Sequence, residues 1–260
     1  MLSENERADA ISALLEADQT KTPCVQLSKR WPHITIEDSY AISHALAKRR
    51  RDAGAKVIGH KIGLTSKAMQ QSSQIDEPDY GILLDSMMIA DGSKVPHENY
   101  CIPRVEPELT FILKEPLMGP NVSLVDVLRA TDYVVPSIEI IDARVQNPRK
   151  IYDTVADNGA AAGIVLGGRP VRPMDVDLRW IGAIFFRNSE IEETGIAAGV
   201  LNHPAMAVAW LANKLAPFDV SLQPGHVILS GSFTRPVWAN KGDTLHADFG
   251  TLGSVSVQFI

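Results

Sequence analysis

The chain has 260 residues, of which 45% are hydrophobic and 22% charged, a composition typical of a globular protein with one large core or a large and a small domain. Its formal net charge of −6 and the lack of a basic patch exclude nucleic acid as the expected partner. The two cysteines, Cys24 and Cys101, have no metal-ligand spacing, which argues against a zinc site or a disulfide framework and favours a reducing compartment.

Insertion into a membrane is not expected. No apolar run approaches the ~20 residues that a membrane span needs, and the first residues are polar and acidic, unlike a signal peptide. We therefore expect a cytoplasmic protein without a membrane partner.

Helices are expected at the N-terminus. Helical periodicity begins near Glu4, and Thr35 with Asp38 resembles a capping box in which Asp replaces the usual Glu or Gln. The helix that follows this box would end near Gly54. We therefore predict a helical N-terminal segment over residues 1–55 and a β-rich catalytic domain over residues 56–260.

From residue 56 onward, short apolar runs alternate with Gly, Pro, Asn and Asp, which is typical of strands. The expected strands are 57–62, 106–113, 133–141, 162–166, 179–187, 226–231, 244–249 and 255–259. Two helices interrupt them, one after Ser123 and one near Pro204. Mostly strands with few helices predict an α+β fold with a mixed, β-rich core, not a doubly wound sheet.

A lysine lies inside the first of these strands. Lys61 is surrounded by apolar residues and by glycines that allow a close approach of the backbone. Burial of an ammonium group needs a partner, so we expect Lys61 to face carboxylates or a bound anion. It would then stabilise developing negative charge or transfer protons, and the alternative is a structural ion pair.

The segment 66–79 differs from its surroundings. It contains Ser, Gln, Lys and one Met residue and no convincing strand. Beside a candidate site, such a stretch is typical of a mobile lid, although an inert surface loop fits its composition equally well.

Three glutamates are the strongest candidates for chemistry. Glu106 and Glu108 would share one face of the strand 106–113, since side chains at i and i+2 point the same way, and Glu139 would join them from the strand 133–141. Three carboxylates beside apolar residues need a cation to stay ionised. Oxygen ligands without Cys or His nearby favour Mg²⁺ or Mn²⁺ over Zn²⁺.

The alternative is that Glu106 and Glu108 lie on a solvated face. Two features favour the metal site. Pro107 between them cannot donate to a ladder and marks an edge or a bulge, which is common beside active sites. Glu139 lies in an apolar run, where an unpaired carboxylate would be costly.

Together these segments resemble the hydratase and decarboxylase branch of the fumarylacetoacetate hydrolase superfamily, over nearly the whole chain. The stretches that carry the resemblance are GHKIGLTS at 59–66, RVEPELTFIL at 104–113, PSIEIIDAR at 136–144, TVADNGAAAG at 154–163 and GTLGSV at 250–255. Three stretches, 59–80, 199–204 and 232–236, place the closest likeness among the hydratases. The resemblance implies a β-rich core of the C-terminal-domain type of this superfamily and a higher homo-oligomer of decamer-like size.

For the site, the resemblance implies Mg²⁺, with Mn²⁺ as an alternative, on Glu106, Glu108 and Glu139. The implied catalytic residues are Lys61 and Asp79. Contacts to the substrate are expected from Leu64, Thr65, Lys67 and Arg235. Of these, Arg235 is the first candidate for the distal carboxylate of a diacid, and Lys67 is the second.

The implied reaction is hydration of a seven-carbon dienoic diacid, in its 2-oxo or 2-hydroxy form, in homoprotocatechuate degradation. The metal would hold the C1 carboxylate and the C2 oxygen. Asp79 or Lys61 would move the proton that converts the dienol to an α,β-unsaturated ketone, and water would add at C4. Hydration of a five-carbon dienoate and decarboxylation of a six-carbon oxo-diacid stay open as alternatives, as does a non-catalytic partner subunit of a pathway enzyme complex.

Two departures from the superfamily's patterns narrow these expectations. Ala160 stands where some relatives have a serine, so a hydroxyl contact to substrate at this position is in doubt. The hydrolases of the superfamily use a His–Glu pair on their lid, and 66–79 contains no histidine. C–C bond hydrolysis is therefore disfavoured.

Overall fold

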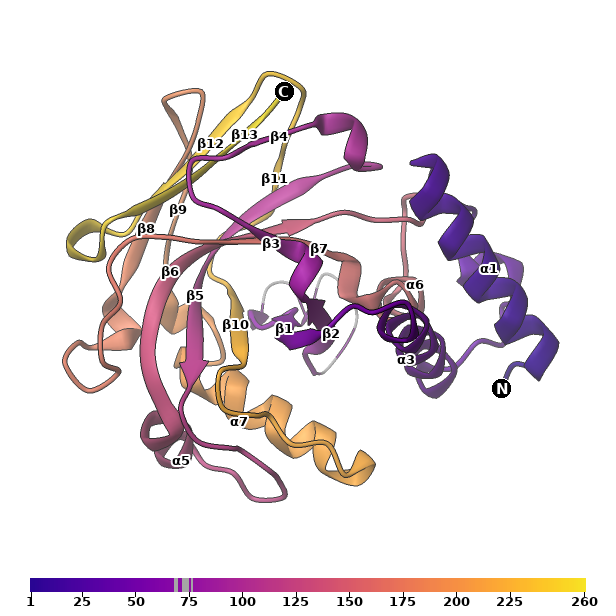
Figure 1. Ribbon diagram of the computed structural model, residues 1–260, viewed down its shortest axis with the longest axis horizontal. Coiled ribbons are helices and arrows are strands. Elements are labelled where there is room, and N and C mark those ends of the chain that lie inside the picture. The colour runs from indigo at the N-terminus through magenta and orange to yellow at the C-terminus, as the bar shows by residue number, and fades with distance from the viewer. Residues whose placement is uncertain (68–69, 72–74, 76) are drawn as a thin grey trace.

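The computed structural model describes residues 1–67, 70–71, 75 and 77–260, which form two β-sheets and the helices around them (Figure 1). The helices are α1 (Glu4–Thr20), α2 (Leu27–Arg30), α3 (Ile36–Asp52), α5 (Leu124–Ala130), α6 (Ile151–Ala156) and α7 (Pro204–Leu215). In Figure 1, α1, α3 and α6 lie to one side of the sheets, and α5 lies near α7. This is the predicted α+β fold with a helical N-terminus and mixed sheets. Within the described ranges, the helices are too short or too polar to cross a bilayer.

The two long N-terminal helices begin at capping residues. The Ser3 hydroxyl accepts a hydrogen bond from the backbone N–H of Glu6, and the Glu6 carboxylate accepts one from the backbone N–H of Ser3 at 2.8 Å. Thr35 and Asp38 make the same reciprocal pair at α3, so the predicted capping box is confirmed. Each box satisfies backbone donors that the first helical turn leaves without a partner.

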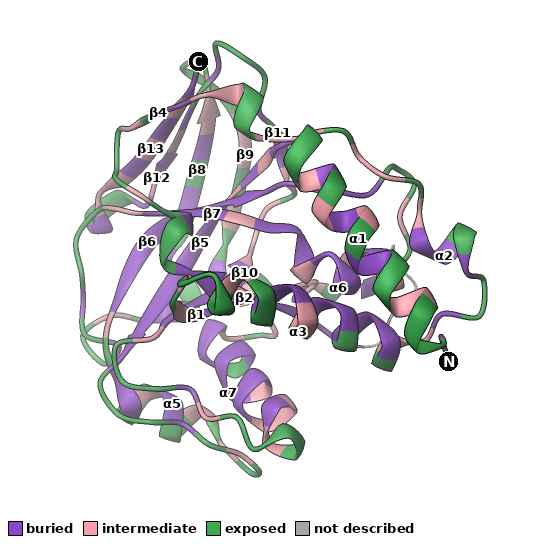
Figure 2. Ribbon diagram, turned by 45° about the vertical axis from the view of Figure 1, so that its right-hand side comes forward, coloured by how far each residue is buried: buried purple, intermediate pink, exposed green. Residues whose placement is uncertain are grey.

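A hydrophobic cluster joins these helices to the later chain. It includes Leu14 of α1 and Ile42 of α3, together with Val145 and Ala156. Figure 2 shows buried and exposed residues alternating along α1 and α3, as expected for helices with one face in a core. The domain division at residue 55 stays a prediction.

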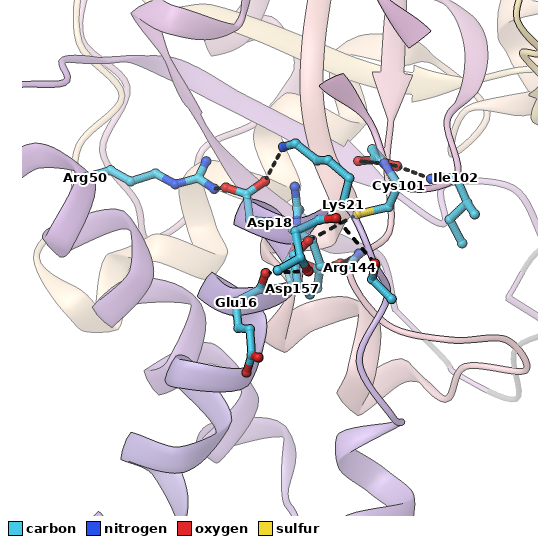
Figure 3. A network of polar contacts seen from close by, with 12 residues as sticks. Glu16, Asp18, Lys21, Arg50, Cys101, Ile102, Arg144 and Asp157 are labelled. Atoms are coloured by element: carbon cyan, nitrogen blue, oxygen red, sulfur yellow. Dashed lines mark hydrogen bonds and ion pairs between the residues drawn. The ribbon is translucent and has the colours of Figure 1, made fainter. Parts of the chain in front are cut away.

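Polar contacts reinforce this junction (Figure 3). The buried guanidinium of Arg144 donates to the carboxylate of Asp157, and its backbone N–H donates to the same carboxylate at 2.8 Å. Asp18 of α1 pairs with Arg50 of α3 at 2.8 Å and with Lys21 at 3.2 Å. Charged groups are thus paired where the helices meet the rest of the molecule.

The larger sheet has the strand order β2-β1-β10-β5-β6-β7-β3, and β11 also pairs with β5. Its strands are β1 (Val57–Gly63), β2 (Asp79–Leu84), β3 (Met88–Ile89), β5 (Arg104–Leu113), β6 (Thr131–Ile141), β7 (Ala161–Leu166), β10 (Val227–Ser232) and β11 (Val237–Trp238). β1 is parallel to β10, whereas β5 is antiparallel to both β10 and β6. Within this sheet, the predicted strands are confirmed to within two residues at each end.

The smaller sheet has the order β4-β13-β12-β8-β9. Its strands are β4 (Lys94–Val95), β8 (Gly182–Arg187), β9 (Glu190–Ile196), β12 (Thr244–Asp248) and β13 (Ser254–Phe259). One large core contains Phe111 of the larger sheet, Phe185 and Phe259 of the smaller sheet and Leu211 of α7. Burial of these apolar faces is the main force that holds the sheets together.

Some predicted boundaries were wrong. The start of the predicted strand 179–187 belongs to a 3₁₀ helix, Leu178–Trp180, which the Asp177 side chain caps by accepting a hydrogen bond from the backbone N–H of Arg179. Asp79, predicted to lie on a lid, is the first residue of β2 and pairs with Gly63 of β1. The rest of the predicted lid lies partly outside the described residues.

The expectation for Pro107 was half right. β5 is a central strand, so Pro107 does not mark an edge. It does lie at an irregularity, because the pairing with β10 shifts between Leu229 and Ser232, and β11 pairs with β5 only at Arg104 and Val105. Pro107 has no N–H to donate at this irregularity. Its carbonyl accepts a hydrogen bond from the Ser232 hydroxyl at 3.2 Å.

Candidate functional site

Successive side chains of β5 point alternately to the hydrophobic core and to the candidate site. Val105, Leu109 and Phe111 point into the large hydrophobic core. Glu106 and Glu108 therefore point to the opposite face of the sheet. A strand that is apolar on one face and acidic on the other carries the candidate chemistry of this protein.

The neighbouring strand supplies the third carboxylate. Glu139 of β6 is the register partner of Glu106 of β5, which brings the two side chains to the same face. Carboxylate oxygens of Glu106, Glu108 and Glu139 all lie within 4.8 Å of one another. The structure thus brings together the three glutamates that the sequence indicated.

Glu108 and Glu139, the two buried carboxylates of this cluster, have few hydrogen-bond partners among the described residues. Glu108 accepts a hydrogen bond from the backbone N–H of Gly231 at 2.8 Å. Both carboxylate oxygens of Glu139 are buried, and neither accepts a hydrogen bond from the part of the chain that the structure describes. Burial and the charge of Glu139 raise the pKa of Glu106 to about 7 and the pKa of Glu108 well above its usual range.

A divalent cation fits this arrangement. The donors are carboxylate oxygens, which suit hard ions such as Mg²⁺, Mn²⁺ and Ca²⁺. The buried oxygens of Glu139 that accept no hydrogen bond are free to coordinate an ion. A bound ion would also offset the repulsion that raises the pKa of each carboxyl group.

Lys61 lies beside the glutamates, on β1. Its side chain is 5% exposed, and its Nζ lies 3.5 Å from Oε1 of Glu139. Burial alone would lower the pKa of Lys61, but Glu139, Asp79, Glu106 and Glu108 outweigh it and raise that pKa. The carboxylates therefore keep Lys61 protonated. The partner expected for this buried ammonium is present.

Asp79 faces Lys61 across a glycine. A methyl group on Gly63 would lie 2.2 Å from Oδ1 of Asp79 and 3.0 Å from Nζ of Lys61, so the backbone of β1 leaves room for both charged groups. Oδ1 of Asp79 is buried and has no hydrogen-bond partner among the described residues. Asp79 is therefore held by strand pairing, with one oxygen available to a ligand.

The glutamates and Lys61 open onto a cavity of about 250 Å³. Of the predicted site residues, the ones that line it are Lys61, Leu64, Thr65, Asp79, Glu106 and Glu108. Glu139 lies beneath them, 1% exposed. The other two predicted substrate contacts are not brought into the cavity: Lys67 is exposed, and Arg235 is exposed and pairs with Glu193.

Two arginines line the cavity that the sequence did not single out. Arg104 is the first residue of β5, two positions before Glu106, and Arg149 lies in the segment between β6 and α6. The i, i+2 spacing could have identified Arg104. The sequence did not indicate a role for Arg149, because this residue follows Asn147 and Pro148 in a segment without helical or strand periodicity.

The comparisons with known proteins agree with this geometry. The family model described as Fumarylacetoacetate (FAA) hydrolase C-terminal matches residues 51–260. Over 252 residues the chain is 56% identical to the 2-oxo-hept-4-ene-1,7-dioate hydratase of Escherichia coli, with 94% of each protein covered. Over 236 residues it is 36% identical to the 4-oxalocrotonate decarboxylase of Pseudomonas putida, with 90% of this chain and 89% of the relative covered.

The fold matches a solved structure of the 4-oxalocrotonate decarboxylase from Pseudomonas putida G7, complexed with magnesium and adipate. The TM-score is 0.96 at 33% identity, with 100% of this chain and 99% of the other covered. The same decarboxylase has also been solved with calcium and acetate, so this relative binds divalent cations. The chain belongs to the fumarylacetoacetate hydrolase family.

Proposed function

We propose that the chain is a metal-dependent hydratase, a hydro-lyase that acts on 2-oxo-hept-4-ene-1,7-dioate in its 2-hydroxyhepta-2,4-diene-1,7-dioate form. The product is 4-hydroxy-2-oxoheptane-1,7-dioate. The observation that carries the proposal is the 56% identity, over 94% of the chain, to the Escherichia coli enzyme of that name. The proposed setting is the degradation of homoprotocatechuate in the cytoplasm.

The proposed cofactor is Mg²⁺ on Glu106, Glu108 and Glu139, with Mn²⁺ as an alternative. The oxygen-only donor set and the buried Glu139 oxygens without hydrogen-bond partners support this assignment. When bound, the ion supplies Lewis-acid stabilisation of negative charge on the C2 oxygen of the substrate.

Lys61 and Asp79 are the proposed catalytic residues. The ammonium of Lys61 would lie beside the C2 oxygen and stabilise the charge that develops there. Asp79 would accept the proton of the C2 hydroxyl and return a proton at C5, which converts the dienol to an α,β-unsaturated ketone, and Lys61 is the alternative carrier. The hydroxyl of a water then bonds to C4 while C3 gains a proton. The burial of Asp79 and its position beside Lys61 support this division of roles.

The walls of the cavity would orient the substrate. Leu64 and Thr65 line it at the end of β1, and we propose that they contact the carbon chain and the C1 end. Thr65 is held firmly, because it is 3% exposed and its carbonyl accepts a hydrogen bond from the backbone N–H of Leu201 at 3.2 Å.

The second candidate function is decarboxylation of 4-oxalocrotonate. It is favoured by the TM-score of 0.96 to the Pseudomonas putida G7 decarboxylase. The same glutamates would serve both reactions, so the product separates them: a hydratase adds one water, whereas a decarboxylase releases CO₂.

The experiment follows the purified protein with Mg²⁺ and freshly generated 2-hydroxyhepta-2,4-diene-1,7-dioate. Loss of dienol absorbance, a product heavier by one water and inhibition by EDTA are expected. Release of CO₂ would assign the decarboxylase activity. Turnover of 2-hydroxypenta-2,4-dienoate alone would assign a five-carbon hydratase. Absence of any turnover together with co-purification of a second pathway enzyme would favour a partner subunit.

We also propose a higher homo-oligomer, decamer-like in size. Exposed apolar side chains on and near the strands β8 and β9 support it, among them Trp180, Ile184 and Ile191. Exposed apolar groups beside an edge strand are typical of an assembly surface. Light scattering coupled to gel filtration would give the mass, and a monomer at micromolar concentration would contradict the proposal.

A further inference from the structure

The face of β5 that bears the glutamates also bears a cation. Arg104, Glu106 and Glu108 follow one another at i, i+2 spacing and line the same cavity. Two residues of a strand span roughly 6.6 Å, which is comparable with the length of an extended seven-carbon chain. The cavity is therefore acidic toward one end of β5 and basic toward the other.

Arg104 already has partners inside the protein. Its guanidinium lies over the ring of Trp238, 5.2 Å from the ring centroid. Burial lowers the pKa of Arg104, and the charge of Glu106 works in the opposite direction. The contact with Trp238 thus helps to hold this arginine at the wall of the cavity.

Among the residues that the structure describes, Arg149 has no comparable partner. Its Nη1 is buried and donates no hydrogen bond within the described ranges of the chain, and no ion pair reaches its side chain there. Burial and the nearby Arg104 both lower the pKa of Arg149. A buried guanidinium N–H without an acceptor is costly, so the position is maintained at the expense of stability.

A carboxylate would satisfy this group. The planar fork of a guanidinium matches the two oxygens of a carboxylate, and two neighbouring arginines favour an anion over any neutral group. The lysines that line the cavity are less suited to this role than the arginines. Lys61 is paired with Glu139, and Lys150 is exposed to solvent.

We propose that Arg149, supported by Arg104, binds the distal carboxylate of the diacid whose C1 end lies at Glu106, Glu108 and Glu139. This assignment rests on the proposed function and deepens it. It replaces Arg235, which pairs with Glu193 outside the cavity, as the residue that distinguishes a diacid from a shorter monoacid.

Two saturated ligands test the assignment without turnover. 2-Oxoheptanedioate and 2-oxoheptanoate have the same chain length and the same C1 end, and they differ only in the distal carboxylate. Calorimetry in the presence of Mg²⁺ would measure both dissociation constants. For the wild type we expect the diacid to bind roughly 10- to 100-fold more tightly than the monoacid, because it would gain hydrogen bonds between charged groups.

The variants separate Arg149 from the other cations. Arg149→Gln should lose most of the preference for the diacid while its affinity for the monoacid changes less than threefold, which also shows that the site is folded. Arg149→Lys keeps the positive charge but loses the two parallel N–H donors of the guanidinium. It should retain part of the preference for the diacid. Arg172→Gln, at an exposed arginine that does not line the cavity, is the matched control and should keep all of it.

Several outcomes would overturn the assignment. One is full preference in Arg149→Gln, another is its loss in Arg235→Gln or Lys150→Gln instead, and a third is a wild type that does not distinguish the two ligands. If Arg149→Gln fails to fold, the other variants decide. The assignment would be overturned if Arg149→Lys kept the full preference for the diacid while Arg235→Gln lost it. A wild type that distinguishes the ligands without hydrating the dienol would contradict the proposed function but not the subsite.

Discussion

At the scale of single residues, the energetic problem of this molecule is an excess of negative charge at a largely buried site. Glu106, Glu108, Glu139 and Asp79 gather around one ammonium group, that of Lys61. Lys61 can neutralise one carboxylate, and the others remain in a medium that solvates them poorly. The raised pKa values of Glu106 and Glu108 express this cost. A bound divalent cation would neutralise these carboxylates and would also supply a Lewis acid.

Glu106→Gln should therefore remove metal binding and catalysis together. An amide keeps the shape of the side chain but not its charge, so we expect at least a 100-fold loss of turnover with the fold retained. Mg²⁺ titration by calorimetry and the dienol assay check both effects. The control is Glu98→Gln, at an exposed glutamate that does not line the cavity. Full turnover by Glu106→Gln after metal removal would rule out the metal-centred scheme.

The same residue predicts how the stability of the metal-free protein depends on pH. The pKa of Glu106 is raised from 4.5 to about 7, so between these values the folded state holds a proton that the unfolded state has lost. This contribution to the unfolding free energy therefore falls as pH rises from 4.5 to 7. Melting temperatures in EDTA should decline more across this window for the wild type than for Glu106→Gln.

The comparison between the two proteins is needed because a buried histidine acts in the opposite direction. Burial lowers the pKa of His60 to about 3, so its contribution to stability rises with pH up to its ordinary value. That contribution is common to both proteins and cancels in the difference. Identical pH profiles for the wild type and Glu106→Gln would contradict the expectation.

At the scale of elements, the long strands could be predicted because runs of β-branched and aromatic residues specify them. The acidic cluster followed from one rule, that residues at i and i+2 of a strand share a face. The register that places Glu139 opposite Glu106 could not be predicted, since it depends on how β6 pairs with β5. Cross-strand register is a tertiary property.

Other elements left little signal. β9, Glu190–Ile196, is an edge strand with mostly exposed residues, so it lacks an apolar face. α6, Ile151–Ala156, has six residues, too few to establish helical periodicity. Asp79 was assigned to a lid because the residues before it are polar, whereas its own position is fixed by pairing between β2 and β1.

This pairing leads to a prediction at Gly63. A methyl group there would lie 2.2 Å from Oδ1 of Asp79. Pairing with β2 on one side and β10 on the other keeps β1 from moving away. Gly63→Ala should therefore displace Asp79 and lower kcat by at least tenfold, since small errors in position are costly in catalysis. The dienol assay and thermal melting would measure activity and stability separately.

Gly199→Ala is the matched control for this substitution. Within the described part of the chain, a methyl group at Gly199 would meet only Phe233, at an ordinary contact distance of 3.7 Å. Its kinetics and melting temperature should match the wild type. Unchanged kcat in Gly63→Ala would mean that Asp79 need not keep its position, and its catalytic role would have to be abandoned.

At the scale of the whole molecule, two ion pairs near the junction of the N-terminal helices with the later chain differ in how deeply they are buried. Asp157→Asn would leave the buried guanidinium of Arg144 without its counter-charge, and removal of one partner from a buried pair costs about 3–5 kcal/mol. Asp18→Asn, at a half-buried pair, should cost about 1 kcal/mol or less. Denaturant unfolding midpoints would compare them, and equal losses would contradict the distinction.

The strand order also bears on how the candidate site assembles as the chain folds. β5 and β6 are consecutive long strands and can pair early, whereas Lys61 reaches its place only when β1 pairs with β10, which joins residues 59–61 to residues 227–229. Nonlocal pairing of this kind is slow. We therefore expect the carboxylates to meet before their ammonium partner arrives. A divalent ion present during refolding would relieve that repulsion and accelerate folding as well as stabilise the folded state.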